Sequence, residues 1–88
     1  MRHIAELPLL LATAMNAKLR DNKHKTGWQL LSKRTLLFRI SKEMKELKKA
    51  LDRRAPLAEV VSEAADVANY LAMLCANYES ELYDENLS

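Results

Sequence analysis

Four acidic residues form two pairs with the same spacing. Glu43 and Glu46 are three positions apart, and Glu63 and Asp66 repeat that spacing in the following segment. Residues three apart on a helix share one surface, so each pair can direct its carboxylates at a common point. Oxygen-only clusters of this type normally bind hard divalent cations such as magnesium or manganese. Such a metal can hold triphosphate oxygens and lower the pKa of a water molecule, which is hydrolase chemistry.

The position of each pair on its helix bears on this interpretation. On a helical wheel, Glu43 lies at the border of an apolar stripe and Glu46 about 60° farther out, and Glu63 and Asp66 are arranged in the same way. We therefore expect the four acids at one rim of the seam between two antiparallel helices. An acid on a helix face is more often solvated without a metal, and periodicity alone leaves that alternative open.

The segments that carry these acids are predicted to be helical. Strand-like alternation is absent, good helix formers dominate, and the chain has one glycine and two prolines. We predict an all-α fold, an antiparallel bundle of three to four helices. The first helix is expected from about Pro8 to Leu19, and the polar, basic stretch from Arg20 to Gly27 is expected to be a loop.

The second helix is expected to begin after Ser32, which can cap it, and to end before Pro56, which opens the third helix through a tight turn. The third helix is expected from about Leu57 to Tyr83, with frayed residues from about Asp84. The predicted core stripes are Leu36, Leu37, Ile40, Met44, Leu47 and Leu51 on the second helix, and Val60, Ala64, Val67, Leu71, Leu74, Cys75 and Tyr78 on the third.

Length and composition set the scale of the molecule. Eighty-eight residues with 49% hydrophobic content suffice for one domain, residues 1–88, and leave an apolar face for another copy to complete. We therefore expect an oligomer. The lone cysteine, Cys75, is interpreted as a buried thiol in a reducing compartment, which favours the cytoplasm. No apolar stretch has the length that would cross a bilayer, so no membrane partner is expected.

Charge is divided sharply along the chain. All fourteen Lys and Arg residues lie between Arg2 and Arg54, whereas residues 55–88 contain seven acids and no base. This division fits either a polyanion-binding half or two complementary faces that pack together. Two alternatives to a hydrolase follow, a helical nucleic-acid-binding module and a non-catalytic regulator. No DNA-reading motif is recognised, so nucleic acid is not the expected partner.

The acidic segments resemble a known family. Lys42-Glu43-Met44-Lys45-Glu46 followed by Glu63-Ala64-Ala65-Asp66 resembles the bipartite acidic signature of MazG-type nucleotide pyrophosphohydrolases, in particular the compact type of phages and mobile cassettes. The segment from Lys18 to Trp28 looks like that family's lead-in, and Glu63 to Tyr70 looks like its second acidic helix. The similarity spans about Asn16 to Tyr78.

This resemblance implies a homodimer or dimer of dimers in the cytoplasm, that of a bacterial host if the chain is phage-encoded. It implies that Glu43, Glu46, Glu63 and Asp66 are the catalytic residues and hold Mg²⁺ or Mn²⁺. The implied reaction converts a nucleoside triphosphate, with purine deoxynucleotides such as dGTP or dATP favoured, to its monophosphate and pyrophosphate, which adjusts or cleans the nucleotide pool. Lys42 stands where the family usually has the first of two successive Glu residues, so the site carries one negative charge fewer.

Five further residues are candidates for binding the substrate. Lys23 and Lys25 can meet the phosphate tail, and Trp28 can stack on a base. Asn69, one turn beyond the second acidic pair, can bond a sugar hydroxyl or a base edge, and Tyr70 can line the same pocket. The alternatives are solvated loop lysines, an indole that caps the core, an interhelix hydrogen bond from Asn69 and packing by Tyr70.

Overall fold

The computed structural model describes residues 2–21 and 27–87, with side chains described as far as residue 84. All regular structure within those residues is helical, as predicted. Two short 3₁₀ helices, η1 (Ile4–Glu6) and η2 (Trp28–Leu30), accompany three α-helices, α1 (Leu7–Asp21), α2 (Lys33–Asp52) and α3 (Leu57–Leu87). The first and third helices extend slightly beyond the predicted ends at Leu19 and Tyr83.

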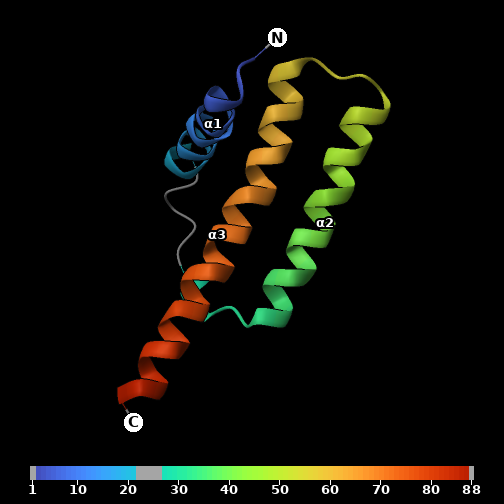
Figure 1. The fold of residues 1–88 in the computed structure, drawn as a ribbon. Coiled ribbons are helices and arrows are strands. Elements are labelled where there is room, and N and C mark those ends of the chain that lie inside the picture. The colour runs from blue at the N-terminus through green and yellow to red at the C-terminus, as the bar shows by residue number, and fades with distance from the viewer. Residues whose placement is uncertain (1, 22–26, 88) are drawn as a thin grey trace.

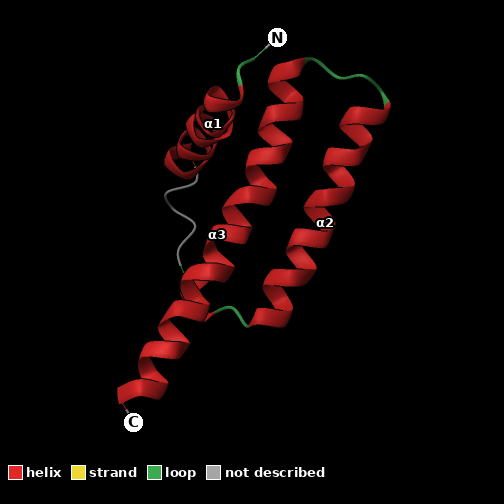
Figure 2. Ribbon diagram, in the orientation of Figure 1, coloured by secondary structure: helices red, strands yellow, loops and turns green. Residues whose placement is uncertain are grey.

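The α3 helix lies in the middle of the molecule, with α1 along one side and α2 along the other (Figure 1). The α2 and α3 helices run antiparallel and are joined by a short loop (Figure 2). Cα atoms of α3 lie close to those of both α1 and α2, so α3 packs against both helices. The described parts of α1 and α2 do not pack against each other. Every site built from two helices in this fold therefore involves α3.

Local signals set both ends of α2. The Ser32 side chain accepts a hydrogen bond from the backbone N–H of Thr35 at 3.1 Å, which caps the first turn as predicted. At the other end Arg54 adopts a left-handed conformation with φ of 54°. The N–H of Ala55 then reaches the carbonyl of Ala50 at 2.9 Å, which closes the helix before Pro56 opens α3. This tight closure makes the antiparallel pairing of α2 and α3 possible.

The buried apolar core of the described residues is small, consisting of Leu36, Ala50, Ala65 and Val67. Along the predicted stripe of α2, Leu36 is buried, and Ile40 and Leu47 are half-buried. The remaining stripe positions are exposed, because α3 is the sole helix that packs on the described part of α2 and covers about half of a wide stripe. These exposed positions are Leu37, Met44 and Leu51.

The prediction of the core face of α3 is partly wrong. Val67 is buried, but Leu71, Cys75 and Tyr78 are exposed, including the cysteine thiol that we expected to be buried. The cause is the rotation of α3, which directs the side carrying Asn69 towards α1 and leaves the opposite apolar side uncovered. Within the described residues, no helix has a stretch long and apolar enough to cross a membrane.

Candidate metal centre

Three of the four predicted metal ligands come together. One oxygen from each of Glu43 on α2 and Glu63 and Asp66 on α3 lies within 4.8 Å of the other two. All three residues are half-buried. The i, i+3 spacing of Glu63 and Asp66 aims both carboxylates at one place, and the antiparallel α2 helix supplies the third across the seam. The fully buried Ala50 of α2, with its small side chain, permits a close approach of α3.

The electrostatics of this three-carboxylate group are visible at Glu43. Burial raises the pKa of Glu43 above its ordinary value of 4.5, and the neighbouring charges of Asp66, Glu63 and Glu46 raise it further, in that order. The positive charge of Lys42 acts in the opposite direction and has the smallest effect. Burial and the acidic neighbours therefore disfavour the charged form of Glu43, and a nearby cation would favour it.

The fourth predicted ligand, Glu46, lies outside the group. Its exposed side chain pairs with Lys49, one turn later on α2, at 3.3 Å. The position agrees with the helical wheel, on which Glu46 lies about 60° farther from the apolar stripe than Glu43. Glu46 is still near enough for its charge to raise the pKa of Glu43.

A lysine that the sequence analysis did not select reaches the group from α1. The Nζ atom of Lys18 donates to Oδ2 of Asp66 at 3.2 Å, and both side chains are largely covered. Lys18 lies one turn after Ala14 and two turns after Leu11 on the packed side of α1. A charged residue in line with core positions is the signal that could have identified it, because such a residue is normally paired.

Asn69, a predicted substrate-binding residue, is buried between α1 and α3. Its amide Nδ2 donates to the backbone carbonyl of Met15 at 3.2 Å, which is the interhelix hydrogen bond considered as its alternative role. Its Oδ1 atom is also buried and has no hydrogen-bond partner among the described residues. An unpaired buried acceptor is costly, and protein atoms cover this one, so a ligand hydroxyl would reach it only after a local movement.

Of the four remaining predicted substrate-binding residues, the structure describes two. Lys23 and Lys25 lie outside the described residues. Trp28 is half-buried in η2, and its carbonyl accepts from Nδ2 of Asn77 at 3.2 Å, which attaches this segment to α3. Tyr70 is half-buried one turn after Asp66, on the side of α3 that also carries Asn77. The structure thus places Trp28 and Tyr70 against the bundle, with neither assigned to a ligand.

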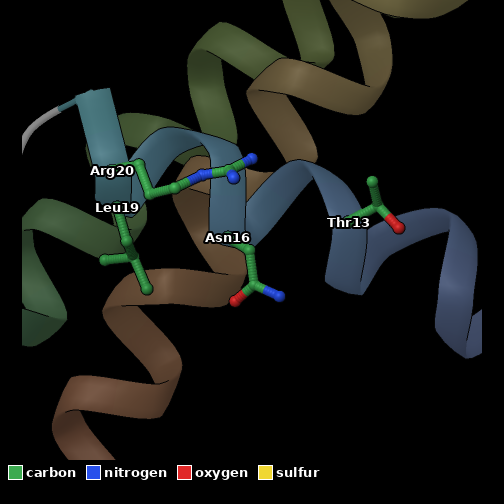
Figure 3. Close-up of a pocket in the computed structure, with 4 residues that line it drawn as sticks. All are labelled: Thr13, Asn16, Leu19 and Arg20. Carbon is green, nitrogen blue, oxygen red and sulfur yellow. The ribbon is translucent and has the colours of Figure 1, made fainter.

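A shallow depression on α1 is separate from the carboxylates. Its lining residues are Thr13, Asn16, Leu19 and Arg20, all exposed (Figure 3). Asn16 and Arg20 are each two positions from Lys18, which puts them about 160° around the helix from the side that faces Asp66. The depression therefore takes no part in the candidate metal centre.

Neither the models of protein families, nor curated protein sequences, nor solved structures match this chain.

The residues present suit a hard divalent cation. The donors are carboxylate oxygens, and around a magnesium ion neighbouring ligands lie about 3 Å apart and opposite ligands about 4.2 Å apart. Three donors include at most one opposite pair, so oxygens within 4.8 Å of one another must move closer by side-chain rotation to bind one ion. The ammonium of Lys18 already occupies one side of the group as a positive charge. The donor chemistry therefore fits magnesium or manganese, with Lys18 as a competing cation at Asp66.

Proposed function

We propose that this chain is a magnesium-dependent nucleotide pyrophosphohydrolase, which converts a nucleoside triphosphate and water to the monophosphate and pyrophosphate. The observation that carries the proposal is the approach of Glu43, Glu63 and Asp66 to within 4.8 Å across two helices. Bringing three carboxylates this close costs mutual repulsion, which a bound divalent cation would relieve. The resemblance of the acidic segments to MazG-type enzymes supports the same reaction.

Each acidic side chain has a distinct part in this proposal. Glu43, Glu63 and Asp66 hold the cation, and Glu46 joins them after leaving its exposed pair with Lys49, which costs little because such pairs are weak. The bound ion supplies charge neutralisation for the phosphate oxygens and lowers the pKa of a water molecule. The half-buried setting of the group strengthens these interactions by excluding part of the solvent.

The substrate assignment follows the resemblance. We assign Lys23 and Lys25 to the triphosphate tail, Trp28 and Tyr70 to the base, and the unpaired Oδ1 of Asn69 to a ligand hydroxyl. Purine deoxynucleotides such as dGTP and dATP are the favoured substrates. The activity belongs in the cytoplasm, that of a bacterial host if the chain is phage-encoded.

The active form in this proposal is an oligomer. A compact monomer of 10.1 kDa exposes about 5,300 Å², whereas this chain exposes 7172 Å². The difference of roughly 1,900 Å² exceeds the ~800 Å² that each partner contributes to a standard interface. We name a set of exposed apolar residues, aligned along α2 and along α3, the outer stripe. It consists of Leu37, Met44 and Leu51 on α2, and Leu57, Leu71, Tyr78 and Leu82 on α3.

The spacing within the outer stripe supports helix pairing between copies. Leu37, Met44 and Leu51 are seven positions apart on α2, and Leu71 and Tyr78 repeat that interval on α3. An apolar repeat of seven residues keeps one side of a helix against a partner helix over several turns. We therefore propose a homodimer, or a dimer of dimers, formed through the outer stripe.

The experiment that tests the activity is a panel of common and modified nucleoside triphosphates incubated with the protein, with and without Mg²⁺, and with products separated by chromatography. We expect pyrophosphate and a monophosphate from at least one deoxynucleotide, lost when Mg²⁺ is chelated and in Asp66→Asn. A panel that stays intact would refute the hydrolase. If calorimetry then showed neither Mg²⁺ nor nucleotide binding by an intact oligomer, the chain would be a non-catalytic regulatory module.

A further inference from the structure

The ion pair between Lys18 and Asp66 differs from the other ion pairs described in this chain. The pairs Lys48–Asp52 and Lys49–Glu46 each lie within one helix turn, and their lysine side chains are 76% and 72% exposed. The pair Arg53–Glu59 spans the turn between α2 and α3, and its side chains are 57% and 40% exposed. The Lys18 and Asp66 side chains are 31% and 26% exposed, and the pair joins α1 to α3. Exposed pairs within a helix contribute little, whereas a covered pair between helices fixes the position of both groups.

The ammonium of Lys18 and a divalent cation would compete for the same carboxylate. Asp66 Oδ2 is 3.2 Å from Lys18 Nζ, and Asp66 also supplies an oxygen to the three-carboxylate group. A metal held by that group would place a second positive charge within a few ångströms of the ammonium. The two positive charges repel each other, so full metal coordination favours movement of Lys18 away from Asp66.

We propose that Lys18 is a positioning residue that neutralises Asp66 in the metal-free protein and turns to the phosphate tail of the substrate when a divalent cation takes its place. This inference rests on the proposed function and adds a residue from α1 to it. The flexible four-carbon stem of lysine allows its ammonium to change partners while the stem stays packed. A metal-bound triphosphate then supplies the negative charge that Asp66 supplied before.

If Lys18 has this role, its substitution should have opposite effects on the binding of metal and of nucleotide, which a purely structural role would not produce. Lys18→Gln removes both a competitor for Asp66 and a repulsive charge, so the free protein should bind metal about two- to fivefold more tightly. The same variant loses a charged hydrogen bond to phosphate, so nucleotide should bind at least about tenfold more weakly. If Lys18 serves merely to dock α1, neither change in this direction is expected.

The test is a titration with Mn²⁺ followed by electron paramagnetic resonance, first alone and then with a non-hydrolysable α,β-imido deoxynucleotide. It compares the full-length protein with Lys18→Gln, Lys18→Met, which keeps the apolar stem, and Lys48→Gln as a matched control for the loss of an ion-paired lysine. We expect tighter Mn²⁺ and weaker nucleotide binding for both Lys18 variants, and no change in either for Lys48→Gln. Unchanged or weaker Mn²⁺ binding by a folded Lys18 variant would overturn the inference.

A second measurement needs no substitution and covers the case in which the variants fail to fold. In nuclear magnetic resonance spectra of the wild-type protein, the signal of the Lys18 ammonium should shift when Mg²⁺ is added. It should shift again when the nucleotide analogue is added. A resonance that responds to neither addition contradicts the inference. Wild-type protein that binds no Mn²⁺ refutes the proposed function itself, whereas binding and hydrolysis with an unresponsive Lys18 refute this inference alone.

Discussion

Glu43 and Glu63 belong to helices that run in opposite directions, and yet an oxygen of one lies within 4.8 Å of an oxygen of the other. The contact depends on the short connection through Arg54 and Pro56, which fixes how far α2 and α3 are shifted along each other. Asp66 enters the same group because it lies one turn after Glu63. The candidate chemistry thus depends on the register of one helical pair.

Removal of a carboxylate from this group should weaken metal binding. Glu43→Gln, Glu63→Gln and Asp66→Asn each remove one charged ligand, and we expect each to reduce Mn²⁺ affinity at least about tenfold and to abolish hydrolysis. Calorimetric titration with Mn²⁺ measures the first effect and pyrophosphate release measures the second.

Glu46→Gln provides the internal comparison for those variants. Glu46 is exposed and paired with Lys49, so its loss should reduce Mn²⁺ affinity less than the loss of Glu43, although both are glutamates on the same helix. Equal effects for Glu43→Gln and Glu46→Gln would mean that Glu46 binds the metal as strongly as the three converged carboxylates, against the arrangement in the structure.

The raised pKa of Glu43 predicts a pH dependence of stability. Burial, followed by the charge of Asp66, raises this pKa, so the folded protein binds the proton more tightly than the unfolded chain does. The contribution of Glu43 to the free energy of unfolding is therefore full at low pH and is lost as pH rises from about 4.5 through the raised folded pKa. Urea unfolding without divalent cations should show wild type losing stability relative to Glu43→Gln over this range.

Magnesium supplies the control for that pH experiment. A bound cation favours the charged carboxylates, so added Mg²⁺ should stabilise the wild type more near pH 7 than near pH 4.5, with a smaller effect in Glu43→Gln. If the difference in free energy of unfolding between the wild type and Glu43→Gln stays constant with pH, the raised pKa of Glu43 is contradicted.

The outer stripe predicts how the chain associates. Leu71→Glu places a charge in the middle of the apolar surface and should weaken the dimer at least about tenfold, because the charge would be buried without a partner. Sedimentation velocity measures the change. Leu30→Glu is the matched control, since Leu30 is 90% exposed in η2, outside the stripe, and its substitution should leave association unchanged. A wild-type protein that sediments as a monomer at tens of micromolar would refute the proposed assembly.

The turn between α2 and α3 contains a site for stabilisation. Arg54 has φ of 54°, a conformation that costs an L-residue about 1–2 kcal/mol, and glycine adopts it without that cost. Glycine also increases the entropy of the unfolded chain, so we expect Arg54→Gly to raise the free energy of unfolding by about 0.5–1 kcal/mol. Thermal unfolding monitored by circular dichroism measures this gain in stability. Arg54→Ala keeps the strained backbone while removing the same charge, and an equal gain there would assign the effect to charge.

Much of the local structure was predictable from the residues. Ser32 is a good N-cap, and the arginines before Pro56 and the proline itself mark the turn, so both ends of α2 were predicted correctly. The pairing of Glu63 with Asp66 also followed from spacing, since residues three apart on a helix must share a side. These features depend on contacts within about one turn, which the sequence encodes directly.

The rotation of α3 was not predictable in the same way. Its apolar residues fit a core face, and yet Leu71 and Tyr78 are exposed while Asn69 is buried against α1. The sequence determined which residues share each side of α3. The choice of the side that meets α1 and α2 required the packing of all three helices, because it depends on the total burial that each rotation permits.

The amino-acid sequence by itself determined the helices, their ends and the spacing of the acids, because these depend on hydrogen bonds and side chains one turn apart. The tertiary structure decided that Glu46 lies outside the three-carboxylate group and that Lys18 reaches Asp66 from 48 positions away. Contacts between distant segments depend on the register and rotation of packed helices, and no local pattern specifies either of them.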